Sequence, residues 1–102
     1  MATARIASGS TEPGVGWQQH GDGVTLTVDT SSGNFTTTPR YVISLSGPGG
    51  NMWISTGGAA SVYEPSSNNF KVFILDREKV KLDVNQVTDN YRWYVNWIGI
   101  ED

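Results

Sequence analysis

The chain has 102 residues, 37% of them hydrophobic, a net charge of −3 and no cysteine. This length suits a single domain with its own core, and the lack of cysteine excludes disulfide bonds and thiolate metal sites. The negative charge argues against a nucleic-acid partner, and no apolar run approaches the roughly 20 residues of a membrane span. No signal peptide opens the chain, so we expect a soluble protein. Export by a non-classical route, or loss of a signal, stays open.

Short β-strands separated by turn residues are predicted along the chain, and no stretch has helical periodicity. The strands expected before the last one are Arg5–Ser8, Val24–Val28, Arg40–Leu45, Phe70–Leu75 and a hairpin of Met52–Ser55 with Ala59–Tyr63. Clusters of glycine, proline, serine and asparagine predict loops between them. The expected loops are Gly9–Gly23, Asp29–Pro39, Glu64–Asn69 and Asp76–Asn90, the last with a marginal strand at Val80 and Leu82.

Alternation of apolar residues indicates which side of a strand faces the core. Along Val24–Val28 the valine and leucine side chains are expected inside and the threonines outside. Two aromatic residues in the predicted loops, Trp17 and Phe35, need burial and are expected to pin those loops to the core. Phe70–Leu75 carries apolar residues on both sides, so we expect it to lie beside another doubly covered strand.

The stretch Tyr91–Glu101 is the richest apolar and aromatic run of the chain, and its composition favours a strand. Period-two spacing places Trp93, Val95 and Trp97 on one side and Tyr94, Ile98 and Ile100 on the other. A strand that is apolar on both sides is expected at the centre of its sheet, with Phe70–Leu75 beside it. One side is then covered by a second sheet. The other is covered either inside the domain or by a neighbouring subunit.

About six strands with glycine-rich turns predict an all-β protein, an antiparallel sandwich or barrel formed by one domain over residues 1–102. Catalysis finds little support, because His20 is the sole histidine and lies in a predicted flexible loop. The run Asp83–Asp89 is rich in oxygen ligands, yet it lacks the glycine and the closing glutamate of an EF-hand. We therefore expect no enzyme activity, no metal and no cofactor.

Sugars are neutral and rich in hydroxyl groups, so proteins hold them with carboxylates, backbone amides in open loops and aromatic faces. The loop Gly21-Asp22-Gly23, in a chain with four tryptophans and four tyrosines, has those ingredients. An alternative interpretation is that Asp22 is only a turn residue between glycines.

Several blocks of the sequence, taken together and in order, resemble the H-type lectin domain, the family of the snail agglutinin and the carboxy-terminal domain of the discoidins. The blocks are Arg5–Gly9, Gly16-Trp17, Pro39–Leu45, Ser61–Tyr63, Asn69–Val72 and Val95–Glu101. The resemblance runs nearly the whole length, and the closing strand is its most specific part. It implies a six-stranded antiparallel β-sandwich that assembles as a homotrimer and binds terminal galactose or N-acetylgalactosamine between protomers.

Site residues follow from the resemblance position by position. Gly21 and Asp22 match a glycine and an aspartate that hold sugar hydroxyls, with His20 adjacent, and Tyr91 matches a tyrosine that flanks the sugar. Two features of the family are missing. Residues 52–60 contain no arginine, and Asp76-Arg77-Glu78 stands where the family has a Trp-His pair. Either Arg77 or Arg92 could supply the lost guanidinium.

Two functions of different classes are therefore predicted. The first is a non-catalytic lectin that recognises glycans of the galactose or N-acetylgalactosamine type at sites between protomers. The alternative is a trimeric scaffold or adhesion module whose loops bind protein partners, which the missing arginine favours.

Overall fold

Strand β6 (Tyr94–Glu101) is the central strand of one of two antiparallel sheets in a computed structural model that describes residues 4–49, 61–75 and 81–102. It lies between β1 (Arg5–Ser10) and β4 (Arg40–Ser46), in the order β1-β6-β4. Trp97 pairs with Gly9 on one side and with Ile43 on the other. The predicted central position of this strand is confirmed.

The second sheet has the order β2-β3-β5, formed by β2 (Gln18–His20), β3 (Gly23–Asp29) and β5 (Asn69–Ile74). The predicted alternation is confirmed in β3, where Val24, Leu26 and Val28 are buried and Thr27 is exposed. Strand β5 alternates in the same way, because every second side chain of a strand points to the same face. Its buried residues are Phe70, Val72 and Ile74.

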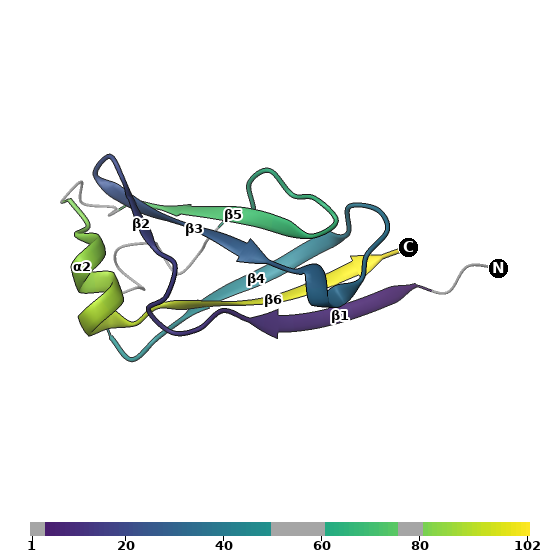
Figure 1. Cartoon of the computed structure of the whole chain (residues 1–102), viewed down its shortest axis with the longest axis horizontal. Helices are drawn as coiled ribbons and strands as arrows, with labels where there is room; N and C mark the ends of the chain where they lie inside the picture. Colours follow the sequence, from purple (N-terminus) through teal and green to yellow (C-terminus); the bar gives the residue numbers. More distant parts are fainter. Residues whose placement is uncertain (1–3, 50–60, 76–80) are drawn as a thin grey trace.

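The two sheets stack face to face with the core between them, which makes a six-stranded antiparallel β-sandwich, as predicted (Figure 1). Trp93 is fully buried, and its indole Nε1 donates to the carbonyl of Gly49 at 2.9 Å. Trp17 is buried as expected and donates from Nε1 to the carbonyl of Trp93 at 2.9 Å. This bond ties the loop before β2 to the residue that precedes β6, the central strand of the other sheet.

Phe35 is also buried, with its ring edge-to-face against Tyr41 at 6.2 Å between centroids. A short 3-10 helix, η1 (Ser31–Gly33), leads into it. Within the described residues no helix is long and apolar enough to cross a membrane.

Strands β5 and β6 do not lie side by side, so the expected neighbourhood of Phe70–Leu75 and the last strand is wrong. Strand β5 pairs with β3 in one sheet, whereas β6 pairs with β1 and β4 in the other. Apolar residues on both faces predict a central position for both strands. Strand β5 is instead an outer strand of its sheet, and its outward Phe73 packs in an aromatic cluster on the surface.

The prediction that Asp76–Asn90 is a loop is wrong in part, because a helical segment occupies some of it. This segment consists of α2 (Val84–Gln86) and the π-helix η2 (Val87–Tyr91). The Asp83 carboxylate caps it by accepting from the backbone N–H of Asn85 at 2.9 Å. A π-helix bonds residues five apart, so its buried positions do not follow the 3.6-residue period by which helices are recognised in sequence.

Two further predictions need adjustment. The segment Gly9–Gly23 is not all loop, since it contains the end of β1 and all of β2. The hairpin expected from Met52 to Tyr63 lies largely outside the described residues, as do Val80 and Arg77. Its last residue, Tyr63, forms an isolated antiparallel bridge with Lys71 of β5.

Candidate functional site

The turn between β2 and β3 presents Asp22 at its tip. His20 pairs with Gly23, which leaves Gly21 and Asp22 as a two-residue hairpin loop. Gly21 has φ +58°, and a positive φ at the first central position fits a type II′ hairpin turn with glycine there. Asp22 is exposed. Among the described residues, none forms a hydrogen bond or an ion pair with its carboxylate.

Gln19 holds this turn in place, which the sequence did not indicate. Its side-chain Nε2 donates to the carbonyls of Gly21 at 2.9 Å, Gly23 at 2.8 Å and Leu82 at 2.7 Å. The carbonyl of Asp22 in turn accepts from the backbone N–H of Leu82 at 2.8 Å. The segment before α2 therefore braces the hairpin through these bonds.

Three aromatic rings gather beside the hairpin, on the outer face of the β2-β3-β5 sheet. Phe73 lies in the middle, with the His20 ring at 4.9 Å and the Tyr63 ring at 5.2 Å, both edge-to-face. A cavity of about 250 Å³ opens there, lined by these three residues together with Gly23 and Leu75. Gly23 also makes a close backbone approach, because a Cβ there would lie 2.4 Å from the carbonyl oxygen of Ile74.

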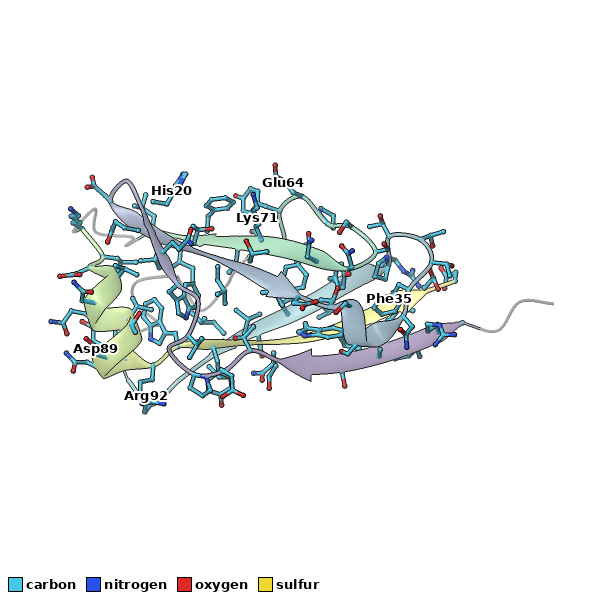
Figure 2. All side chains as sticks on the ribbon, in the orientation of Figure 1. His20, Phe35, Glu64, Lys71, Asp89 and Arg92 are labelled. Atoms are coloured by element: carbon cyan, nitrogen blue, oxygen red, sulfur yellow. The ribbon has the colours of Figure 1, made fainter. Side chains whose placement is uncertain are left out.

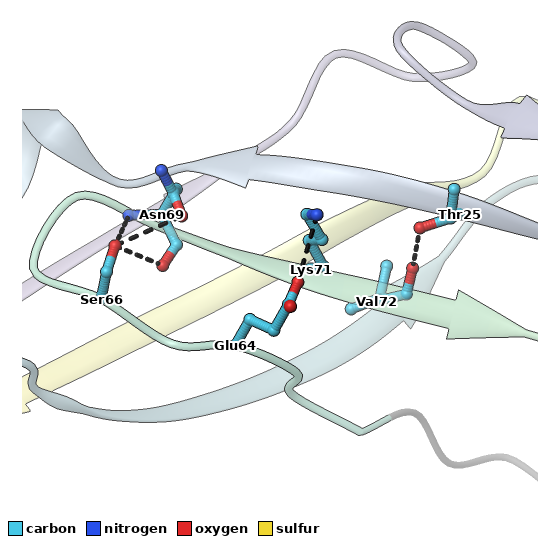
Figure 3. Close-up of polar contacts among 6 residues, drawn as sticks. All are labelled: Thr25, Glu64, Ser66, Asn69, Lys71 and Val72. Atoms are coloured by element: carbon cyan, nitrogen blue, oxygen red, sulfur yellow. Dashed lines mark hydrogen bonds and ion pairs between the residues drawn. The ribbon is translucent and has the colours of Figure 1, made fainter.

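Tyr63 is held against Phe73 by bonds of its own backbone and of the residues that follow it. Figure 3 shows the contacts of Glu64 and Ser66 with Lys71 and Asn69. The backbone N–H and carbonyl of Tyr63 exchange two hydrogen bonds of 2.8 Å with Lys71. The next residue, Glu64, has φ +50° and forms a 3.1 Å ion pair with the Lys71 ammonium. The side chain of Ser66 closes the following turn by accepting from the backbone N–H of Asn69 at 3.1 Å. Tyr63 and Phe73 thus meet across the turn that joins Tyr63 to β5.

Tyr91 and Arg92 lie where η2 ends, just before β6 begins. Tyr91 ends η2 and does not open the last strand, which begins at Tyr94; its ring stacks on Trp93 at 5.5 Å. Arg92 is exposed and has φ +51°. Figure 2 shows Arg92 and His20 on opposite edges of the molecule, with the helical segment between them. A single chain therefore does not bring Arg92 together with His20.

Part of the outer face of the β1-β6-β4 sheet is aliphatic. Ile6 and Val42 are 62% and 60% exposed on its two outer strands. They flank Ile100 and Ile98 of β6, because Ile6 pairs with Ile100 and Val42 pairs with Ile98. Ile98 and Ile100 are half-buried. These four residues are called the aliphatic patch below.

A second cavity, open and about 600 Å³, lies at the far end of the sandwich beside Arg5 and Glu101. The Glu101 Oε2 atom accepts from the backbone N–H and the hydroxyl of Thr36, at 2.8 and 3.2 Å, and from the same two groups of Thr37. The backbone bond from Thr37 contributes most to holding the pKa of Glu101 below its ordinary value. This carboxylate therefore serves to fasten the β3–β4 loop to the end of β6.

Within the described part of the chain no three His, Cys, Asp or Glu side chains gather to hold a metal ion. Comparisons of the sequence with models of known families and with curated proteins, and of the structure with solved structures, found no match.

Proposed function

We propose that this chain is a non-catalytic lectin domain that binds glycans ending in galactose or N-acetylgalactosamine. The observation that carries the proposal is the braced β2–β3 turn, which presents the Asp22 carboxylate to solvent. A carboxylate accepts hydrogen bonds from two neighbouring sugar hydroxyls without moving, if its backbone is already fixed. The clamp by Gln19 supplies that fixation.

The proposed lectin is a homotrimer with its sites between protomers. The aliphatic patch supports association, because exposed apolar residues that cluster on one sheet face mark contact surfaces in soluble proteins. The separation of Arg92 from His20 supports composite sites, in which Tyr91 and Arg92 of a neighbouring protomer would face the Asp22 turn. Arg77, which the sequence also proposes for this role, lies outside the described residues.

A role without catalysis is supported by the surroundings of His20. Its ring packs edge-to-face on Phe73, a hydrocarbon neighbour that neither orients a tautomer nor stabilises an imidazolium as a carboxylate would. The alternative function, a trimeric scaffold that binds protein partners, is favoured by the same aliphatic patch. In that case the Asp22 turn would bind no sugar.

The substitution Asp22→Asn tests the lectin function. It removes the charge and keeps the shape of a solvent-exposed turn residue, so folding should be unaffected. Loss of a charge-assisted hydrogen bond corresponds to roughly a ten- to hundredfold weaker affinity per site. The test is a glycan array, followed by calorimetric titration of the strongest ligand into both proteins.

Asp102→Asn is the matched control, because Asp102 is an exposed aspartate at the opposite end of the sandwich (Figure 1). It should bind like the parent protein. Silence of the parent across the array, with a folded trimer in solution, would instead support the scaffold. Equal affinities of Asp22→Asn and the parent would remove Asp22 from the site.

A further inference from the structure

Apolar side chains gather at one end of the outer face of the β2-β3-β5 sheet. Tyr63 is 48% exposed and Leu75 is 56% exposed, and both lie beside the half-buried Phe73. The outward side chains nearer the start of β5 are polar, among them Thr27 and Lys71. An exposed apolar cluster that is confined to the end next to the Asp22 turn is informative, because isolated surface apolar residues need no explanation and grouped ones do.

The cluster has the geometry of an aromatic slot. His20 and Tyr63 stand at interplanar angles of 63° and 88° to Phe73, on either side of it. The cavity of about 250 Å³ lies between these rings and the residues that end β5. Its position next to the hairpin follows from the register, in which His20 pairs with Gly23 and Gly23 lines the cavity.

We infer that this slot is a subsite for one pyranose ring, with Phe73 as its floor and His20 and Tyr63 as its walls. The inference rests on the proposed lectin function and extends that site beyond Asp22. The apolar C–H face of a sugar packs on aromatic carbon, while its hydroxyl groups turn outward to the neighbouring Asp22 carboxylate and to the polar edges of the His20 and Tyr63 rings.

The size and charge of the slot favour a single pyranose ring as its ligand. Pockets for drug-sized ligands measure roughly 300–1,000 Å³, so a cavity of about 250 Å³ takes a single ring and not a longer segment. Among the described residues that line it, none carries a permanent charge, which favours a neutral ligand. A peptide that adds a strand to β5 is blocked at Lys71, because Tyr63 already fills that backbone position.

The substitution Phe73→Leu tests the subsite, because it removes the aromatic floor and keeps an apolar side chain. The probes are the methyl glycosides of galactose and N-acetylgalactosamine, titrated into the full chain by calorimetry. We expect roughly three- to tenfold weaker binding, the range that aromatic contacts contribute. In the parent protein the C–H protons of the bound sugar should also shift upfield in NMR spectra, and this shift should vanish in the variant.

Thr27→Val is the control on the same face, at an exposed position of β3 that does not line the cavity, and it should bind like the parent. If Phe73→Leu does not fold, Tyr63→Leu tests the same slot from its more exposed wall. Weaker binding by Asp22→Asn together with parent-like binding by Phe73→Leu would overturn the subsite and leave the lectin function standing. No binding of either glycoside by the parent would overturn both.

Discussion

The outer face of the β2-β3-β5 sheet carries aromatic rings around a small cavity, whereas the outer face of the β1-β6-β4 sheet carries the aliphatic patch. The first face adjoins a fixed turn with an exposed carboxylate, whereas next to the aliphatic patch the second carries the neutral side chain of Asn96, which donates to the hydroxyls of Ser44 and Ser46. Aromatic rings beside hydrogen-bonding groups suit a small ligand, and aliphatic side chains in register across three strands suit another protein surface. Under the proposed function, the first face would bind the sugar and the second would mediate assembly.

Both faces depend on the core between them, so the largest expected effect is on stability. Trp97→Ala removes a tryptophan that is 4% exposed and should lower the free energy of unfolding by roughly 3–5 kcal/mol. Thr27→Val, at an exposed position of β3 on the other outer face, should change it by less than about 0.5 kcal/mol. Chemical denaturation of the three proteins measures both values. An unchanged stability of Trp97→Ala would show that the core lies elsewhere.

A charge introduced into the aliphatic patch should abolish assembly, whereas the same charge on the other outer face should not. Val42→Lys places an ammonium group in the aliphatic patch, opposite Ile98, and should convert the proposed trimer to a single chain of 11.1 kDa. Thr27→Lys places the same charge at an exposed position of the other outer face and should leave the trimer intact. Light scattering at micromolar concentration distinguishes these outcomes. A parent protein that is already monomeric would contradict the assembly role.

The smallest expected effect is a pH-dependent change in stability at the far end of the sandwich, where Glu101 lies. The folded protein holds the pKa of Glu101 below the ordinary value of 4.5, so its bonds to Thr36 and Thr37 stabilise the fold above about pH 4.5. That stabilisation is lost as the pH falls through the lowered pKa. Glu101→Gln should therefore melt at a lower temperature than the parent at pH 7, with a difference that shrinks in acid. A difference independent of pH would exclude this linkage.

Features with a local pattern could be predicted from the sequence. The two faces of β6 and the buried residues of β3 follow from alternation along one strand, and both are observed. The Asp22 turn follows from its flanking glycines, and it is a two-residue hairpin. In each case a few adjacent residues contain all the information required.

Features that depend on contacts between separate segments could not be predicted from the sequence. The partner of β5 is set by the register with β3, which no property of β5 alone reveals. The aromatic slot requires Tyr63 and Phe73 to meet across a bridge at Lys71, and the brace of the turn requires Gln19 to reach Leu82. The π-helix η2 could not be predicted from the sequence. Its hydrogen bonds join residues five apart, so its residues follow no standard period.

The division between the two faces is tested most directly by mapping where a sugar binds. Backbone amide NMR shifts of the parent protein would be followed during titration with the methyl glycoside of N-acetylgalactosamine. The account predicts that shifts change at Gly21, Asp22 and Phe73 and stay constant at Ile6 and Val42. Shifts that change only on the aliphatic patch, or that change nowhere at millimolar sugar, would contradict it.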